Sequence, residues 1–350
     1  MAIFSIPNVQ IAGLSAAVPK QTADNIHCDL LSESERKMFI DTVGIRYRRI
    51  APAHVTASDL CLAAGEKLLD QLAWNRQEIS VLVFVTQTPD YIIPNTSSIL
   101  QHKLGLPKST LVFDVNLGCS GYVYGLSIIG SILQNITGGK GLLLVGDVST
   151  HTISAKDQST VPLFSDAGSA TALQFSSGSQ LFFNLQTDGA EYDNIMVEDG
   201  GFRNKTRDSS FDLREFGKGI LRSNLDMKLD GLKIFNFALR EVAPNIHQLL
   251  NHYSIDKESM DAYVFHQANL LMLESVRKKL KAEQAKVPYS LYDFGNTSSA
   301  SVPLTLVTRL REKISSQPMN LLLSGFGVGL SWGSCVATIP PICCPELVEI

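Results

Sequence analysis

The sequence predicts an α/β protein made of two similar halves. Apolar, β-branched runs of strand length, such as Val81–Thr86, alternate along the chain with amphipathic stretches of helical period. The same series of patterns occurs twice: VLVFVTQTPD, LVFDVNLGCS and LLLVGD in the first half match DAYVFHQANL, SLYDFGNTSS and LLLSGF in the second. Self-similarity of this kind in 350 residues indicates an internal duplication of βαβ units. We therefore expect a parallel-rich sheet in each half, with residues 1–178 forming the first half and residues 179–350 the second.

Each element of the first half has its own signal. Residues 9–18 form an apolar run that ends at Pro19 and predicts the first strand, and the amphipathic stretch 57–73 predicts a helix. The other elements expected here are a helix within 30–49 followed by a glycine turn and a basic strand, a strand at 81–86, a helix at 96–104, a strand at 111–115 with a long apolar helix behind it, a strand at 141–146 and a strand pair at 164–173.

The second half starts with the least regular part of the chain. Residues 178–224 are rich in Gly, Asp, Asn and Arg, which predicts surface or active-site loops. Apolar residues at helical spacing then predict a long helix at 231–253, and the repeated patterns follow it.

Composition excludes several functional classes. Apolar residues make up 45% of the chain and charged residues 18%, as in ordinary globular proteins. A net charge of −4 gives no reason to expect nucleic acid or an anionic membrane surface as a partner. No apolar run is long enough to cross a bilayer, and the first 20 residues lack the pattern of a secretion signal. The six cysteines show neither CxxC pairs nor metal-ligand spacing, so we expect reduced thiols in a cytoplasmic protein with no metal.

Cys119 stands at the turn between the strand at 111–115 and the apolar helix, in what we expect to be the first turn of that helix. A thiol there meets unpaired backbone N–H groups and the positive end of the helix dipole, and both favour the thiolate. The apolar circumference of the helix predicts that it is buried. Two interpretations stay open: a nucleophile at the head of a buried helix, or a small apolar cysteine packed at a turn, which is the commoner case for any single cysteine.

The duplication brings two further residues toward Cys119. Thr86 and Cys119 lie 33 residues apart, and His266 and Asn296 lie 30 apart. Cys119 and Asn296 are therefore expected at equivalent strand–helix turns, with His266 at the end of a neighbouring strand. Together the three side chains suit nucleophilic catalysis on an acyl group, with the glycine-rich turn at 325–329 adding backbone donors. Singly, His266 could be a structural histidine and Asn296 a helix cap.

Four motifs surround these residues: DVNLGCSGYVYGL at Cys119, VFHQANLLMLESVRKKL at His266, FGNTSSASVPLTL at Asn296, and SGFGVGLSWGS. Together they resemble β-ketoacyl-acyl-carrier-protein synthase III, a family of the thiolase-like superfamily. VGIRYRR, VTQTPDYIIP, LFSDAGSATAL and LKIFNFALREV extend the resemblance over nearly the whole chain.

The resemblance implies a thiolase-like, duplicated αβαβα five-layer fold, a homodimer and no resident cofactor. It also implies a decarboxylative Claisen condensation that gives a 3-oxoacyl product, in fatty-acid or specialised acyl or polyketide biosynthesis. Cys119 would take an acyl group from a thioester of coenzyme A or of acyl carrier protein, and malonyl-acyl-carrier-protein would then decarboxylate. His266 and Asn296 would stabilise the enolate, and the backbone N–H groups of Cys119 and Val328 would form the oxyanion hole. Ile93 would cross the dimer interface to close the partner's acyl pocket.

Several positions depart from the family pattern. Val328 stands where the family usually has glycine, and Ile93 is smaller than the usual phenylalanine, so a longer or branched acyl group is expected to fit. Met38 and Thr42 replace a tryptophan and an arginine, and Gln158 replaces a second arginine. In the family these groups bind coenzyme A, so the loss of an aromatic platform and two cations argues against a standard acetyl-CoA primer.

A carrier-protein site is expected from the basic residues Arg277, Lys278 and Lys279, although the arginine that follows HQAN-Leu in the family is Leu271 here. An ordinary solvated helix face would have the same composition. The main alternative function is transfer of the acyl group to an alcohol or amine without decarboxylation. A catalytically silent subunit is disfavoured by the intact Cys, His and Asn, and a papain-like protease by the βαβ pattern.

Overall fold

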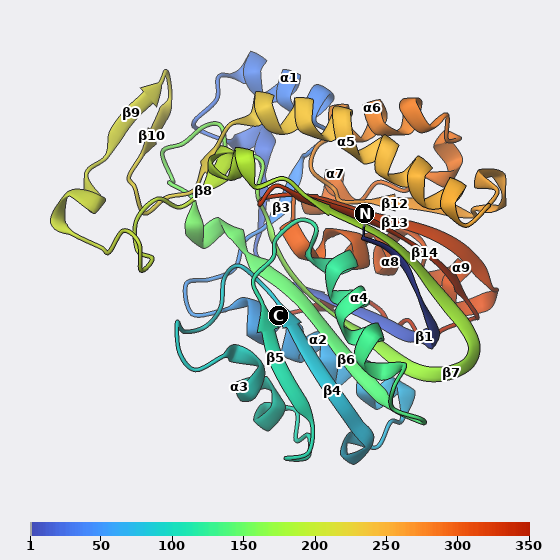
Figure 1. Ribbon diagram of the computed structural model, residues 1–350. Coiled ribbons are helices and arrows are strands. Elements are labelled where there is room, and N and C mark those ends of the chain that lie inside the picture. Colours follow the sequence, from blue (N-terminus) through green and yellow to red (C-terminus); the bar gives the residue numbers. More distant parts are fainter. Residues whose placement is uncertain (1) are drawn as a thin grey trace.

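The computed structural model describes residues 2–350 and arranges them in five alternating layers of helices and sheets (Figure 1). The strands are β1 (Ala2–Val18), β2 (Thr22–Asp24), β3 (Tyr47–Arg49), β4 (Ile79–Val85), β5 (Leu111–Val115), β6 (Lys140–Val148), β7 (Asp166–Thr187), β8 (Ile195–Met196), β9 (Arg214–Gly217), β10 (Ile220–Arg222), β11 (Lys228–Leu229), β12 (Ala262–Phe265), β13 (Met319–Gly327), β14 (Ser331–Ile339) and β15 (Val348–Glu349). The α-helices are α1 (Glu33–Val43), α2 (Ala57–Leu72), α3 (Thr96–Lys103), α4 (Gly121–Leu133), α5 (Gly231–His252), α6 (Leu270–Leu280), α7 (Leu291–Phe294), α8 (Ser301–Arg309) and α9 (Arg311–Ser316).

Two long strands, β1 and β7, pass from one sheet into the other. In the first sheet the order is β5-β4-β6-β7-β1, with β4 parallel to both β5 and β6. In the second the order is β12-β13-β14-β7-β1, with only β12 and β13 parallel. Residues 166–174 of β7 pair with β6, and residues 181–187 pair with β14. The proposed boundary after residue 178 therefore falls inside β7, where that strand changes sheets.

Helices cover both outer faces and fill the space between the sheets. α2 packs on the first sheet, and α5 packs on β7, β13 and β14 of the second. α4 and α8 form the central layer, and α4 contacts strands of both sheets. This position explains why α4 is apolar all round, with Tyr122, Leu126 and Ile129 fully buried. The five-layer α/β prediction is confirmed.

Three details of the sequence-based prediction are wrong. The second sheet is mixed rather than parallel-rich, because β14 runs antiparallel to both β13 and β7; in the first sheet only β7 runs against the other strands. The strand pair expected at 164–173 is part of the single strand β7. The segment SLYDFG, expected as a strand, forms the short helix α7, because Leu291 and Phe294 are buried at helical i, i+3 spacing.

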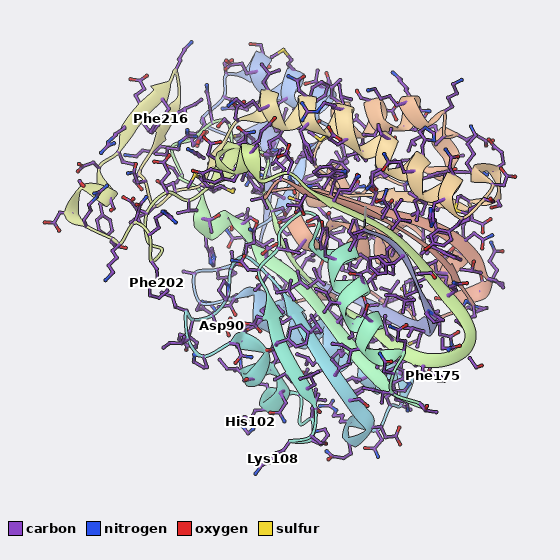
Figure 2. All side chains as sticks on the ribbon, viewed as in Figure 1. Asp90, His102, Lys108, Phe175, Phe202 and Phe216 are labelled. Carbon is purple, nitrogen blue, oxygen red and sulfur yellow. The ribbon has the colours of Figure 1, made fainter. Side chains whose placement is uncertain are left out.

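The irregular part of the chain forms an arm that projects from the body (Figures 1 and 2). Its tip is the hairpin of β9 and β10, and Phe202 and Phe216 on the arm are exposed. Among residues 2–350 no helix is both long and apolar enough to cross a membrane.

Candidate active site

Cys119 lies in the turn between β5 and α4, close to the expected position. The prediction that it belongs to the first helical turn is wrong by two residues, since α4 begins at Gly121. The backbone N–H of Gly121 instead closes a tight turn onto the carbonyl oxygen of Gly118, at 2.6 Å. The turn places the thiol in front of the helix.

The end of β13 packs directly against the nucleophile turn, which explains its glycines. A Cβ atom added at Gly327 would lie 2.9 Å from the Cys119 Sγ, and one added at Gly325 would lie 2.8 Å from the Cys119 carbonyl oxygen. Only glycine permits so close an approach. Cys119, which follows β5 in the first half of the chain, is therefore packed against the end of β13 from the second half.

The prediction that the setting of Cys119 favours the thiolate is wrong for the free enzyme. Burial raises the pKa of the Cys119 thiol to about 11, and the charge of Asp147 acts in the same direction. Hydrogen bonds from the Ser298 hydroxyl and from the backbone of Val328 and Cys119 oppose this rise. Desolvation exceeds these contributions, so the thiol is neutral at rest.

His266 follows the last residue of β12, and only 2% of it is exposed. Burial lowers the pKa of His266 to about 3, so the imidazole is neutral at physiological pH. Its Nδ1 lies 2.7 Å from the Ser301 Oγ, and that oxygen also accepts the Gln267 backbone N–H at 3.3 Å. We assign the Ser301 hydroxyl as the donor to Nδ1, because among the described residues Nδ1 is the one acceptor within hydrogen-bond distance of this hydroxyl. The imidazole proton is then on Nε2.

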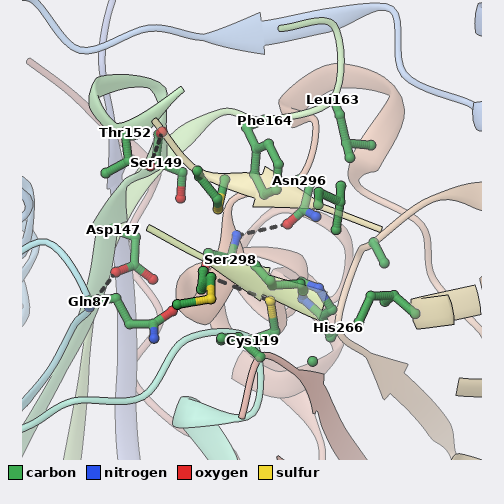
Figure 3. A pocket seen from close by; sticks show the side chains of 18 of the residues that line it. Gln87, Cys119, Asp147, Ser149, Thr152, Leu163, Phe164, His266, Asn296 and Ser298 are labelled. Atoms are coloured by element: carbon green, nitrogen blue, oxygen red, sulfur yellow. Dashed lines mark hydrogen bonds between the residues drawn. The ribbon is translucent and has the colours of Figure 1, made fainter. Parts of the chain in front are cut away.

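Asn296 follows α7 and Gly295, and it is held by backbone and side-chain contacts. Its backbone N–H donates to the Leu163 carbonyl oxygen at 3.0 Å, and its carbonyl oxygen accepts the Ser165 N–H at 2.9 Å. The side-chain Oδ1 accepts the Ser298 N–H at 2.9 Å, which leaves the amide N–H groups as the free end (Figure 3). Because α7 replaces the expected strand, the predicted equivalence with the Cys119 turn is lost, although the side chain still reaches the site.

The three predicted side chains meet in one cavity of about 310 Å³ between the two halves (Figure 3). Val328, the expected oxyanion-hole residue, also lines it. Apolar residues close much of the wall: Leu163, Phe164, Ile195, Met196, Val197, Met227, Leu229, Ile234, Met272 and Phe326. Among the described residues no cluster of His, Cys, Asp and Glu could hold a metal.

Sequence reasoning missed three polar residues that connect the site: Asp147, Ser298 and Ser301. Ser298 contacts the Cys119 Sγ at 3.9 Å and also holds Asn296, while Ser301 holds His266. The run of serines after Asn296 and the buried aspartate at the end of an apolar strand were the available signals.

Two family models match the chain: 3-oxoacyl-[acyl-carrier-protein] synthase III at residues 113–189 and the C-terminal model of the same synthase at residues 250–339. The β-ketoacyl-[acyl-carrier-protein] synthase III of Streptococcus mutans is 30% identical over 92% of this chain and 96% of its own. That of Clostridioides difficile is 30% identical over 93% of this chain and 97% of its own. This chain belongs to the synthase III family.

The solved structures agree with that assignment. A 3-oxoacyl-(acyl-carrier protein) synthase from Burkholderia xenovorans superposes with a TM-score of 0.93 and 38% identity, over 99% of each chain. The synthase III fold thus accounts for the whole chain, including both sheets and the central helices.

Ile93 lies on a loop whose large apolar side chains are exposed to solvent. Tyr91, Ile92 and Ile93 are 61%, 73% and 84% exposed. Ile93 is not among the residues that line the cavity of its own chain, and its role across an interface stays a prediction.

Of the three basic residues on α6, Arg277, Lys278 and Lys279, two already form contacts within the chain. Arg277 pairs with Glu274 at 2.8 Å and donates to the Ala282 carbonyl oxygen, and Lys279 donates to the Leu239 carbonyl oxygen at 2.7 Å. Within residues 2–350, Lys278 has neither a salt bridge nor a side-chain hydrogen bond, so it is the member of the trio left for a partner.

Met38, Thr42 and Gln158, which differ from the synthase III pattern, are either exposed or form hydrogen bonds within the chain. Met38 is 61% exposed, and the Thr42 hydroxyl donates to the Met38 carbonyl oxygen within α1. Gln158 donates to the Lys218 carbonyl oxygen at 2.6 Å, and its backbone N–H donates to Gly219. A residue that is usually a cation in the family thus fastens the arm to the body.

Proposed function

We propose that this chain catalyses a decarboxylative Claisen condensation between an acyl group on Cys119 and malonyl-acyl-carrier-protein, giving a 3-oxoacyl product. The observation that supports it is the meeting of Cys119, His266 and Asn296 in one largely apolar cavity. In the first step the Cys119 sulfur attacks the donor thioester carbonyl, and the donor leaves as a thiol. The backbone N–H groups of Cys119 and Val328, which lower the pKa of the Cys119 thiol, would hold the oxyanion.

The second step requires two donors at one oxygen. Loss of CO2 from the malonyl group leaves an enolate on the thioester, and its carbon attacks the acyl group on Cys119. The His266 Nε2–H and the Asn296 amide N–H groups supply hydrogen bonds to that enolate oxygen. Both residues are held for this role, His266 by Ser301 and Asn296 by Ser298.

The same features weigh against transfer to an alcohol or amine. Such a transfer needs a base that removes a proton from the acceptor. His266, with a pKa of about 3 and its Nδ1 already hydrogen-bonded, is a weak base and a good donor.

We propose an acyl-carrier-protein thioester, rather than acetyl-CoA, as the acyl donor. Met38, Thr42 and Gln158 offer neither an aromatic platform nor a cation for the nucleotide part of coenzyme A. Lys278 on α6 is the proposed contact for the acidic carrier protein.

We also propose a homodimer in the cytoplasm. The exposed apolar loop 91–93 would be covered by a second copy, with Ile93 closing the partner's acyl pocket. The six cysteines are free thiols, which suits a reducing compartment.

Incubation with a panel of acyl-carrier-protein and acyl-CoA thioesters tests the function. Intact-protein mass spectrometry should show one acyl group on the wild type and none on Cys119→Ala. CO2 release from malonyl-acyl-carrier-protein should be lost in His266→Ala, which should still be acylated. An acyl-enzyme that releases no CO2 and passes its acyl group to an amine would contradict the proposal.

A further inference from the structure

Asp147 is a buried carboxylate without a part in either step of the condensation. It is the last but one residue of β6, lines the cavity and is 1% exposed. Its Oδ1 accepts the Gln87 backbone N–H at 2.8 Å (Figure 3) and the Thr86 hydroxyl at 3.2 Å. Its Oδ2 accepts the Ser299 backbone N–H at 3.2 Å and the Ser299 hydroxyl at 2.5 Å. A backbone N–H cannot accept, and one faces each oxygen, so the surroundings suit an ionised carboxylate although burial raises its pKa.

These hydrogen bonds join the two halves of the chain beside the nucleophile. Thr86 and Gln87 follow β4, so they belong with Asp147 to the first half. Ser299 is the middle residue of the short 3-10 helix η8 (Ser298–Ala300), which comes from the second half and is buried. The carboxylate therefore fastens η8 to the ends of two strands of the first sheet.

The segment 296–301, which contains η8, supports both donors to the enolate. The Asn296 Oδ1 accepts the Ser298 N–H at 2.9 Å, and this bond fixes the direction of the amide. At the other end of the segment the Ser301 Oγ lies 2.7 Å from the His266 Nδ1. Ser298 has a φ of 49°, in the left-handed region that residues other than glycine rarely adopt, so this conformation depends on the contacts around it. A contact at the middle of the segment therefore bears on both donors.

Cys119 is held mainly by contacts that do not involve Asp147. Its turn closes through the hydrogen bond between Gly118 and Gly121, and the glycines at the end of β13 pack against it. Its contact with the Ser298 hydroxyl is a long one, at 3.9 Å. The charge of Asp147 raises the pKa of the Cys119 thiol, so loss of that charge does not hinder formation of the thiolate.

We propose that Asp147 is a positioning residue for decarboxylation, which acts through its hydrogen bonds to Ser299. By holding the segment 296–301, these bonds aim the Asn296 amide and the His266 imidazole at the enolate oxygen. The role rests on the proposed function, because the enolate is an intermediate of the condensation. Loss of the carboxylate charge should therefore affect the two steps in different ways. Decarboxylation slows because the donors lose their alignment, whereas acylation is unchanged or faster because the pKa of the thiol falls.

Three variants separate the two steps. Asp147→Asn keeps the shape of the side chain but leaves one backbone N–H facing an amide NH2, and it should slow decarboxylation about tenfold or more. Ser299→Ala removes one hydroxyl and keeps the backbone bond to Asp147, and it should slow decarboxylation about two- to tenfold. Asp166→Asn is the matched control, because that carboxylate is also buried and accepts two backbone N–H groups and a hydroxyl, from Thr150 and Ala51. It should leave the ratio of the two rates unchanged.

Acylation is followed by intact-protein mass spectrometry with an acyl-carrier-protein thioester. Decarboxylation is followed as CO2 release from malonyl-acyl-carrier-protein by enzyme that has first been acylated. Asp147→Asn should show a lower kcat for CO2 release, an unchanged KM and an acylation rate at or above that of the wild type. An equal fall in both steps would overturn the role, since a general weakening of the fold would then explain the variant. An equally selective fall in Asp166→Asn would overturn it too.

If Asp147→Asn does not fold, Ser299→Ala decides, and decarboxylation at the wild-type rate in that variant overturns the proposal. A wild type that is acylated but releases no CO2 would overturn the proposed function, and the role of Asp147 with it. A wild type that releases CO2, together with an Asp147→Asn enzyme that does so equally fast, would overturn the positioning role alone.

Discussion

Ser301→Ala should slow decarboxylation while leaving Cys119 able to accept an acyl group. The Ser301 Oγ lies 2.7 Å from the His266 Nδ1, and both residues are buried. This hydrogen bond selects the imidazole tautomer with the proton on Nε2, where the enolate oxygen needs it. A buried hydrogen bond between neutral groups contributes a net of about 0.5–1.5 kcal/mol. Since about 1.4 kcal/mol corresponds to a factor of ten, the expected loss is about two- to twelvefold in the decarboxylation rate.

The assay is CO2 release from malonyl-acyl-carrier-protein by enzyme that has first been acylated, with the acylation confirmed by intact mass. Ser290→Ala is the matched control. The Ser290 hydroxyl is also buried and lies 2.7 Å from the Thr305 hydroxyl, but the hydrogen bonds of Ser290 do not include His266. Its removal should lower the free energy of unfolding by a similar amount without slowing decarboxylation.

Two results would refute the tautomer argument. One is a Ser301→Ala enzyme that decarboxylates at the wild-type rate. The other is an equal loss in Ser290→Ala, because a general weakening of the fold would then explain both variants.

Three further predictions follow from the same geometry. Gly327→Ala should slow acylation of Cys119 about tenfold or more, because the new Cβ would lie 2.9 Å from the Sγ; acyl-enzyme formation measured by mass spectrometry checks this, and a normal rate would contradict the packing. The free energy of unfolding should fall as pH drops from about 6.5 toward 3, because the unfolded state binds a proton at His266 that the native state, with a pKa of about 3, does not bind. Urea titrations at pH 7.5 and 5 check this, and the fall between the two pH values should be smaller in His266→Gln than in the wild type. Ile93→Asp should shift the protein toward monomer in sedimentation experiments, and an unchanged dimer would exclude loop 91–93 from the interface.

The local patterns of the sequence predicted most elements near their observed bounds. The helix expected at 57–73 is α2, and the strand expected at 111–115 is β5. These segments follow the apolar periodicity of a single element, which depends only on neighbours in the chain. The repeated patterns also led to Cys119, His266 and Asn296, which line one cavity as expected.

The predictions failed where contacts with residues distant in the sequence decide the secondary structure. Nothing local shows that SLYDFG forms α7, because its burial depends on the sheet and helices around it. Likewise β7 was not recognised as one strand, since its two parts gain their partners from β6 and β14.

By itself the sequence determined which residue types stand at the turns of the two halves, and so the kind of chemistry. Only the tertiary structure decided the protonation states of these residues and the contacts that hold their side chains. Desolvation raises the pKa of Cys119, contrary to the prediction made from the helix terminus alone, and it lowers the pKa of His266. Asp147 reaches Ser299 across 152 residues of sequence, and Ser298 is aimed at Cys119 by a left-handed backbone. Burial and contacts of this range arise from packing the two halves together, so no local pattern contains them.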